Sequence, residues 1–316
     1  MATPPLLDRR LVIVTGKGGV GKSTVAAALA LVAARAGKRV LVCEVNAQER
    51  IAPLLGAPRA GHEIREAVPG VFTVNVTPHE AMREYGLMVV KFRTIYEAVF
   101  ENRLVRYFLR VIPSLAELVM LGKILFEAKA EERGQPRWDL VIVDAPATGH
   151  AVQLLRVPSA LVDTIPGGPL RRDADWMEAM LVDPERTSVA IVTLPEEMPV
   201  NEAVELDAQV RGVLGMHRGA LFVNAMPDAR FTAAEVARLE PLATRPPPLG
   251  PAARAARLQA LRAEQAARYL ARARAALDVT PTVIPLLPVV EWGPAAVERV
   301  AEVIAADAAA AAGGRA

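Results

Sequence analysis

A glycine-rich segment near the N-terminus has the residue types and the spacing that bind a polyphosphate. Its glycines allow backbone N–H groups to converge on an anion, and a following helix directs the positive end of its dipole at the same anion. Lys22 would neutralise the β- and γ-phosphates, and the Ser23 hydroxyl would ligate Mg²⁺. The spacing G-x-x-x-x-G-K-S therefore predicts a site for a nucleotide and Mg²⁺. The segment consists of Gly16, Lys17, Gly18, Gly19, Val20, Gly21, Lys22, Ser23 and Thr24.

An acidic side chain follows directly on one of the apolar runs of the chain. The run from Leu140 to Val143 is continued by Asp144. A carboxylate in this place can hold a Mg²⁺-bound water opposite a phosphate loop. Ser23 and Asp144 are therefore the candidate metal residues, with Asp144 acting through water.

The elements that must position these residues are short apolar strands separated by helical stretches. Continuous apolar strands of this kind predict an α/β fold with a mostly parallel, doubly wound sheet that is covered on both faces. Ligands of such sheets bind at the carboxyl ends of the strands, where Gly16, Asn46, Asp144, Thr193 and Asn224 are expected. The predicted strands are Leu11 to Val14, Arg39 to Val45, Val71 to Val76, Leu140 to Val143, Ser188 to Thr193, Gly219 to Asn224 and Thr282 to Leu287.

Longer segments between the strands predict helical insertions in a single domain spanning residues 9–305. The first insertion, residues 79–136, contains no expected strand and carries a wide apolar stripe broken at Pro113; the second covers residues 159–186. The stripe either packs on the sheet domain or forms a groove for a partner or client. A helical surface layer is expected at 229–278, and no structure is assigned to the flexible Ala/Gly tail 306–316. The stripe includes Ile95, Val99, Leu104, Phe108, Ile112, Leu115, Val119 and Leu125.

Composition limits the classes of partner. The chain has 37 Lys and Arg against 35 Asp and Glu, a balance that argues against coating a nucleic acid. Arginines gather between Arg245 and Arg274, interspersed with alanine at helical spacing, which is typical of a solvated helix face. Cys43 is the only cysteine, so one chain holds no disulfide and no cysteine-based metal site. No apolar run spans a membrane and no signal peptide is evident, so a cytoplasmic location is expected.

Two stretches of the sequence resemble a known family. The second lysine of the loop, Lys17, gives the form K-G-G-x-G-K-S, which is similar to the loops of dimeric nucleotide switches such as the MinD/ParA, nitrogenase iron protein and ArsA/GET ATPases. The segment from Asp144 to His150, with Leu154, Leu155 and Pro158 after it, resembles D-T-A-P-T-G-H-T-L-R-x-L-x-x-P of the ArsA/GET (arsenite-pump and tail-anchored-protein-targeting) ATPases. Further similar stretches occur in the expected order between Thr73 and Gly293.

The resemblance implies a P-loop ATPase that acts as a Mg²⁺-dependent, ATP-binding switch. It implies a homodimer, or a heterodimer with a related ATPase, in which Lys17 reaches the partner's nucleotide. It also implies that nucleotide controls the binding of an apolar protein client or a membrane partner. A nucleic acid is not expected among the partners. Asn224 would bind the adenine edge, and the stretch from Pro288 to Glu291 would line the base. The second switch, which reports the γ-phosphate, would comprise Ala147, Thr148, Gly149 and His150.

Three departures from the family pattern bear on this function. Asn46 falls near the position where the family usually has an Asp that orients the attacking water. An amide cannot accept a proton, so we expect hydrolysis to be slow, to use Glu44 instead, or to be lost. Strand alternation would place Glu44 and Asn46 on the same face. The zinc-clamping Cys-x-x-Cys is absent, as are the metalloid-binding cysteines and a second phosphate loop. An ATP-sensing scaffold without turnover therefore remains an alternative, whereas an arsenite-type transporter subunit is poorly supported.

Overall fold

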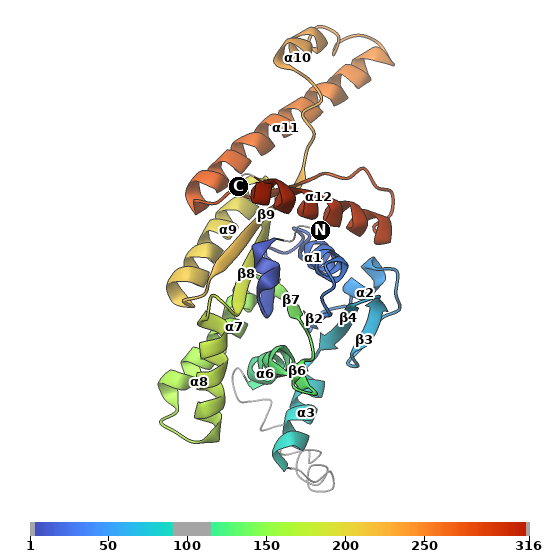
Figure 1. Cartoon of the computed structure of the whole chain (residues 1–316). Helices are drawn as coiled ribbons and strands as arrows, with labels where there is room; N and C mark the ends of the chain where they lie inside the picture. Colours follow the sequence, from blue (N-terminus) through green and yellow to red (C-terminus); the bar gives the residue numbers. More distant parts are fainter. Residues whose placement is uncertain (1–3, 91–114, 314–316) are drawn as a thin grey trace.

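The computed structural model describes residues 4–90 and 115–313, and its centre is an eight-stranded sheet. The strand order is β10-β9-β8-β1-β7-β2-β4-β3, and all neighbours are parallel except β3 and β4 (Figure 1). The α/β sheet and all seven predicted strands are confirmed. The edge strand β3 was missed because it is short, charged and partly exposed, without an apolar run. The strands are β1 Leu11–Gly16, β2 Val40–Val45, β3 Arg65–Val68, β4 Val71–Val76, β7 Leu140–Ala147, β8 Thr187–Thr193, β9 Arg218–Met226 and β10 Thr282–Pro285.

Helices cover both faces of the sheet, which explains the continuous apolar strands. Alternate residues of β1 point to opposite faces, so Val12 and Val14 join one core cluster while Leu11 and Ile13 join the other. The first cluster packs on α1 (Lys22–Arg35) and α12 (Pro294–Gly313). The second packs on α6 (Leu115–Lys129), α7 (Thr148–Thr164), α8 (Pro169–Val182) and α9 (Glu197–Ala208).

The first insertion is helical at both of its described ends. It contains α3 (Pro78–Val90) and α6, and then a small hairpin of β5 (Glu131–Glu132) and β6 (Gln135–Pro136) that corrects the expectation of no strand. Arg133 and Gly134 turn the hairpin with positive φ, a local geometry that no apolar pattern marks. Val119 and Leu125 of the predicted stripe are buried in the core, whereas its residues from Ile95 to Pro113 lie outside the described residues. The remaining short elements are η1 Pro5–Asp8, α2 Ile51–Leu54 and η2 Gln209–Val213.

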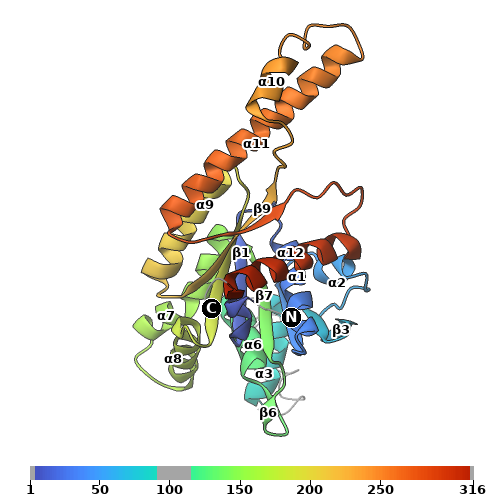
Figure 2. The ribbon, with the colours of Figure 1, turned by 45° about the horizontal axis from the view of Figure 1, so that its top comes forward.

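The predicted surface layer is instead a projecting arm, defined here as residues 229–278. It consists of α10 (Ala233–Leu239) and α11 (Leu249–Leu277), which extend away from the sheet in both views (Figures 1 and 2). The end of α11 contacts the core through Tyr269, Leu270, Ala273 and Leu277, whereas residues 249–266 join neither described core cluster. Helical periodicity predicts the helices but cannot show that one of them extends beyond the core that it packs against.

The Ala/Gly tail also differs from expectation. Residues 306–313 continue α12, and Ala308 lies on the buried side of this helix, while residues 314–316 lie outside the described residues. Alanine has the most favourable helix propensity of all residues, so an alanine run at the end of an anchored helix extends that helix. Low complexity alone was therefore a poor indicator of missing structure.

Candidate nucleotide-binding site

The glycine-rich loop connects β1 to α1 and requires glycine at two close approaches. Gly16 has φ 151°, and a Cβ built there would lie 2.1 Å from the Val192 carbonyl oxygen. Gly21 has φ 93°, and its Cβ would lie 2.2 Å from Nδ2 of Asn224. Any larger residue would therefore clash or strain the backbone. The loop thus keeps backbone N–H groups accessible at the N-terminus of α1, as a polyphosphate site needs.

Both lysines of the loop lie at this site. Nζ of Lys22 donates a hydrogen bond to the Lys17 carbonyl oxygen at 3.1 Å. Burial lowers the pKa of Lys22, and the positive charge of Arg50 lowers it further, while Asp144 opposes both effects. The Lys17 ammonium forms an ion pair with Glu202 of α9 in the same chain, and each of these side chains is about 30% exposed. Lys17 therefore has a partner within its own subunit.

The candidate metal residues are brought together by the sheet. Asp144 of β7 lies in register with Val14 of β1, and Oγ of Ser23 donates to Oδ2 of Asp144 at 2.6 Å. The second carboxylate oxygen, Oδ1, is buried and has no hydrogen-bond partner among the described residues. Burial raises the pKa of Asp144, while Ser23 and Lys22 lower it. A hydroxyl beside a buried carboxylate oxygen with spare capacity fits Mg²⁺, which prefers such oxygen ligands and would neutralise phosphate charge when bound.

Glu44 lies beside Asp144, whereas Asn46 follows the end of the strand. Glu44 of β2 pairs in register with Asp144 and is 1% exposed, and its carboxylate accepts from the backbone N–H groups of Arg50 at 2.6 Å and Ile51 at 3.3 Å. Asn46 is exposed and has φ 45°, because β2 ends at Val45 and the backbone turns there. Strand alternation therefore does not extend to Asn46, and its approach to the site stays a prediction.

Glu44→Gln is expected to change how stability depends on pH. Burial raises the pKa of Glu44 from its usual 4.5 to about 7, although the two backbone hydrogen bonds lower it. Between these values the folded protein keeps a proton that the unfolded chain has lost, so the free energy of unfolding falls as pH rises from 4.5 through 7. Across this range the free energy of unfolding of the wild type should fall by roughly 3 kcal/mol more than that of Glu44→Gln. Urea unfolding of nucleotide-free protein at pH 4.5 and 8 measures the difference; equal changes in both proteins would contradict the assignment.

Asn224 supports the phosphate loop from the end of β9. It is buried, and Nδ2 donates to the Val20 carbonyl oxygen at 2.9 Å. The structure therefore brings Asn224 to the site, while its contact with adenine stays a prediction. Pro288 and Glu291 are exposed between β10 and α12, and their contact with the base also stays a prediction. Trp292 of the same segment is 52% exposed.

The predicted second switch lies next to the loop. Gly16 pairs with Ala147 across a break in register, and Oγ1 of Thr15 donates to the Pro146 carbonyl oxygen at 3.4 Å. Ala147 caps α7, whose first residues are Thr148, Gly149 and His150, with Gly149 and His150 exposed. A shift at the loop can therefore reach α7 directly through β7.

One charged residue at the site was missed by sequence reasoning. The positive charge of Arg50, at the start of α2, lowers the pKa of both Lys22 and Asp144, so this guanidinium acts on the phosphate site. The hydrogen bond from its backbone to Glu44 holds this turn close to β2. No motif marks Arg50; its position just after the strand-end loop at Asn46 was the only available signal.

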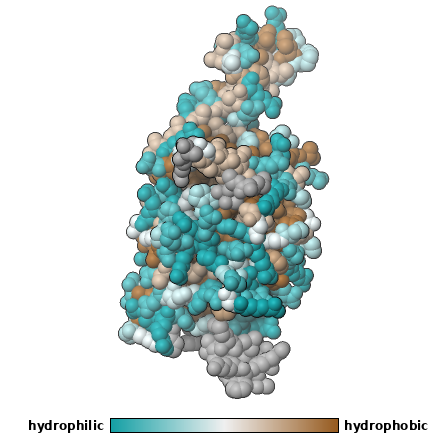
Figure 3. All heavy atoms as spheres, in the orientation of Figure 1, coloured by the Kyte–Doolittle hydropathy of each residue, from teal (hydrophilic) through white to brown (hydrophobic). Residues whose placement is uncertain are grey.

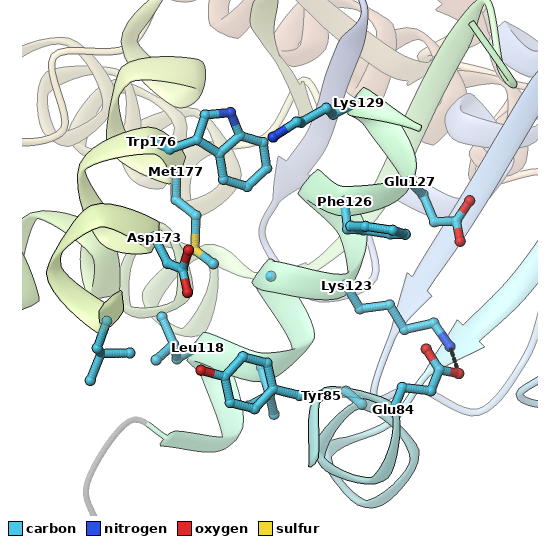
Figure 4. A pocket seen from close by; sticks show the side chains of 14 residues that line it. Glu84, Tyr85, Leu118, Lys123, Phe126, Glu127, Lys129, Asp173, Trp176 and Met177 are labelled. Atoms are coloured by element: carbon cyan, nitrogen blue, oxygen red, sulfur yellow. Dashed lines mark hydrogen bonds and ion pairs between the residues drawn. The ribbon is translucent and has the colours of Figure 1, made fainter. Parts of the chain in front are cut away.

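A separate cavity of about 420 Å³ lies between α3, α6 and α8. In Figure 4 the Lys129 ammonium points to the Trp176 ring, 4.5 Å from its centroid, and the Lys123–Glu84 ion pair closes the opposite wall. Phe126, which is 55% exposed, forms part of the apolar lining of the cavity. Both helical insertions thus contribute to one largely apolar cavity.

Comparisons with known proteins agree with this geometry. Residues 9–166 match the family model described as anion-transporting ATPase. The ATPase BagA of Mycobacterium tuberculosis is 31% identical over 235 residues, covering 72% of this chain and 68% of its own. An arsenical pump-driving ATPase of Escherichia coli is 30% identical over 220 residues, 69% of this chain but 35% of its own length. In the described part of the chain, every helix is too short or too polar to cross a membrane.

Proposed function

Since the chain belongs to the ArsA-type family of anion-transporting ATPases, which bind and hydrolyse ATP, we propose that it is a Mg²⁺-dependent switch whose dimerisation is controlled by nucleotide. The observation that carries this proposal is the Ser23–Asp144 hydrogen bond beside Lys22, at a loop that tolerates only glycine at Gly16 and Gly21. Calorimetry with ATP, with and without Mg²⁺, tests the binding. Phosphate release from Mg²⁺-ATP tests the turnover.

Different residues of the site would have different roles in such a switch. The loop N–H groups and Lys22 bind the phosphates, and Ser23 and Asp144 would hold Mg²⁺. Arg50, whose positive charge already lowers the pKa of Lys22, would add positive charge to the phosphate site. The Thr15–Pro146 hydrogen bond links the loop to β7 and α7, which packs on α8 and α6, so nucleotide state can reach the helices around the cavity.

Lys17 must exchange partners for a nucleotide sandwich to form. In the single chain its ammonium is held by Glu202, and binding in trans to the partner's phosphates would break that ion pair. Glu202→Gln is therefore expected to strengthen ATP-dependent dimerisation by roughly threefold to tenfold, since partly exposed pairs contribute about 1 kcal/mol. Lys17→Ala should weaken dimerisation and leave ATP binding to one chain intact. Sedimentation with ATP and with ADP measures both effects.

Glu205→Gln is the matched control for this exchange. Glu205 lies on the same helix and is exposed, and it makes no ion pair with the described residues. It should leave dimerisation unchanged. If Glu202→Gln weakened the dimer, Glu202 would itself belong to the interface; if Lys17→Ala lowered nucleotide affinity alone, Lys17 would act on its own subunit.

The cavity between the insertions supports a role in binding an apolar client. Its walls combine Phe126, Trp176 and Met177, and it is bounded by α6 and α8, which pack on the switch helix α7. Transport of arsenite is less well supported, because the single thiol, Cys43, is buried and its pKa is raised by that burial. A buried neutral thiol is not available as a metalloid ligand.

A further inference from the structure

The cavity between α3, α6 and α8 is bounded by one aromatic ring from each helix. Tyr85 belongs to α3, Phe126 to α6 and Trp176 to α8, and all three line the cavity. In Figure 4 their side chains lie on different sides of the space. The face of an aromatic ring carries partial negative charge, so it attracts cations and disfavours anions. The arrangement therefore suits a ligand that combines a positive charge with apolar surface.

Most of the charged groups in the cavity wall already have partners. Glu84 of α3 forms an ion pair with Lys123 of α6, whose side chain is 9% exposed. Glu127 accepts a hydrogen bond from Nε1 of Trp138 at 2.8 Å and lies 3.4 Å from the Arg137 guanidinium. Each of these two carboxylates is balanced by a cation, so a ligand meets no net charge from them.

Asp173 of α8 adds a third carboxylate to the cavity wall. It makes no ion pair or hydrogen bond within the part of the chain that the structure describes. Burial raises the pKa of Tyr85, and the negative charge of Asp173 raises it further, so this charge acts within the cavity. Figure 4 shows the carboxylate beside Met177, a flexible side chain that adapts to the shape of a ligand. A carboxylate among aromatic rings and a thioether is complementary to an organic cation.

One cation already lies against this aromatic lining. Nζ of Lys129 is 4.5 Å from the centroid of the Trp176 ring, within the range of a cation–π interaction. Lys129 is the last residue of α6 and is exposed, so its ammonium can turn into water and leave the ring free. The ammonium of Lys129 thus occupies the place that the charged group of a ligand would take.

We propose that the cavity binds a monovalent organic cation with an apolar body, an alkylammonium or arylammonium ion, with its charge between Asp173 and Trp176. This inference rests on the client-binding role proposed above for the cavity and names the chemical class that the cavity selects. Its volume of about 420 Å³ lies in the range of small-ligand sites. Hydrophilic residues predominate on the lower body, around α6 and α8, in the view of Figure 3, which favours an enclosed ligand over a broad apolar contact. A purely apolar client, by contrast, gains nothing from the carboxylate.

Three ligands with the same alkyl chain and different head groups test the sign of the charge. The probes are octyltrimethylammonium, octanol and octanoate, used at concentrations where no micelles form. Calorimetry with the full chain should show that the cation binds most tightly and the anion most weakly. The cation should bind about tenfold more tightly than octanoate, because the ring faces and the carboxylate both favour positive charge.

Two substitutions in the cavity should change the affinity for the cation in opposite directions. Asp173→Asn should weaken the binding of octyltrimethylammonium about fivefold and leave the binding of octanol unchanged. Lys129→Gln should strengthen the binding of the cation about threefold, because the competing ammonium on Trp176 is removed. The matched control is Glu178→Gln, which removes one negative charge from the same helix outside the cavity lining. The control should bind all three ligands like wild type, and thermal unfolding without ligand checks that each variant is folded.

The outcomes separate the class of ligand from the client-binding role itself. Octanol or octanoate bound as tightly as the cation, or a cation affinity that Asp173→Asn leaves unchanged, would overturn the inference and leave an apolar-client site in place. An apolar helical peptide that binds the protein when none of the three ligands does would also overturn it, in favour of a protein client. If neither the peptide nor any of the three ligands binds, the client-binding role is rejected together with the inference.

Discussion

Lys22→Ala is expected to abolish measurable ATP binding, a loss of at least a hundredfold or about 2.7 kcal/mol. Lys22 is the cation of the phosphate loop, and it lies at the first residue of α1 with Nζ directed back to the Lys17 carbonyl oxygen. Burial lowers its pKa, which indicates a partly dry site where a charge-assisted hydrogen bond to phosphate is strong. Calorimetry with Mg²⁺-ATP measures the change.

Folding of this variant is checked without nucleotide. Alanine has high helix propensity, so α1 should persist and the thermal unfolding midpoint should change little. ATP affinity equal to that of wild type in a folded variant would reject the phosphate site at this loop.

The second large effect concerns which side chain acts on the attacking water. If water activation is impaired because Asn46 replaces a carboxylate, Asn46→Asp should raise turnover about tenfold. This gain is equivalent to about 1.4 kcal/mol of transition-state stabilisation. If Glu44 acts instead, Glu44→Gln should reduce turnover by a hundredfold or more and Asn46→Asp should change little. The geometry favours the second account, because Glu44 is buried beside Asp144 while Asn46 is exposed at a turn. Single-turnover phosphate release at saturating Mg²⁺-ATP distinguishes them.

Glu44 also orients α2 through two backbone hydrogen bonds, so a purely structural role needs a separate readout. Glutamine can still accept these bonds, and therefore ATP affinity should persist in Glu44→Gln. A variant that loses affinity and turnover together would indicate that Glu44 positions the turn at Arg50. Turnover unaffected by either substitution would reject both mechanisms.

Local patterns in the sequence were sufficient for the central part of the site. The loop from Gly16 to Thr24 and the strand that ends in Asp144 each lie within a few consecutive residues, and their spacing carries the chemistry. Strands buried on both faces are continuously apolar, which made the parallel sheet predictable. Because parallel strands align their carboxyl ends, Ser23 and Asp144 could be expected at one edge, and the structure joins them by a hydrogen bond.

Tertiary structure alone decided the contacts between segments that are distant in sequence. Glu202 holds Lys17, and Asn224 holds the loop at Val20; neither pairing leaves a trace in local periodicity. The sequence by itself therefore determined the loop, the sheet and the positions of the candidate metal residues, because these depend on near neighbours and on which faces are apolar. The partner of Lys17, the turn that follows β2 at Asn46 and the projection of the arm depend on where strands end and how far helices extend beyond the core. Only the packed chain sets those lengths.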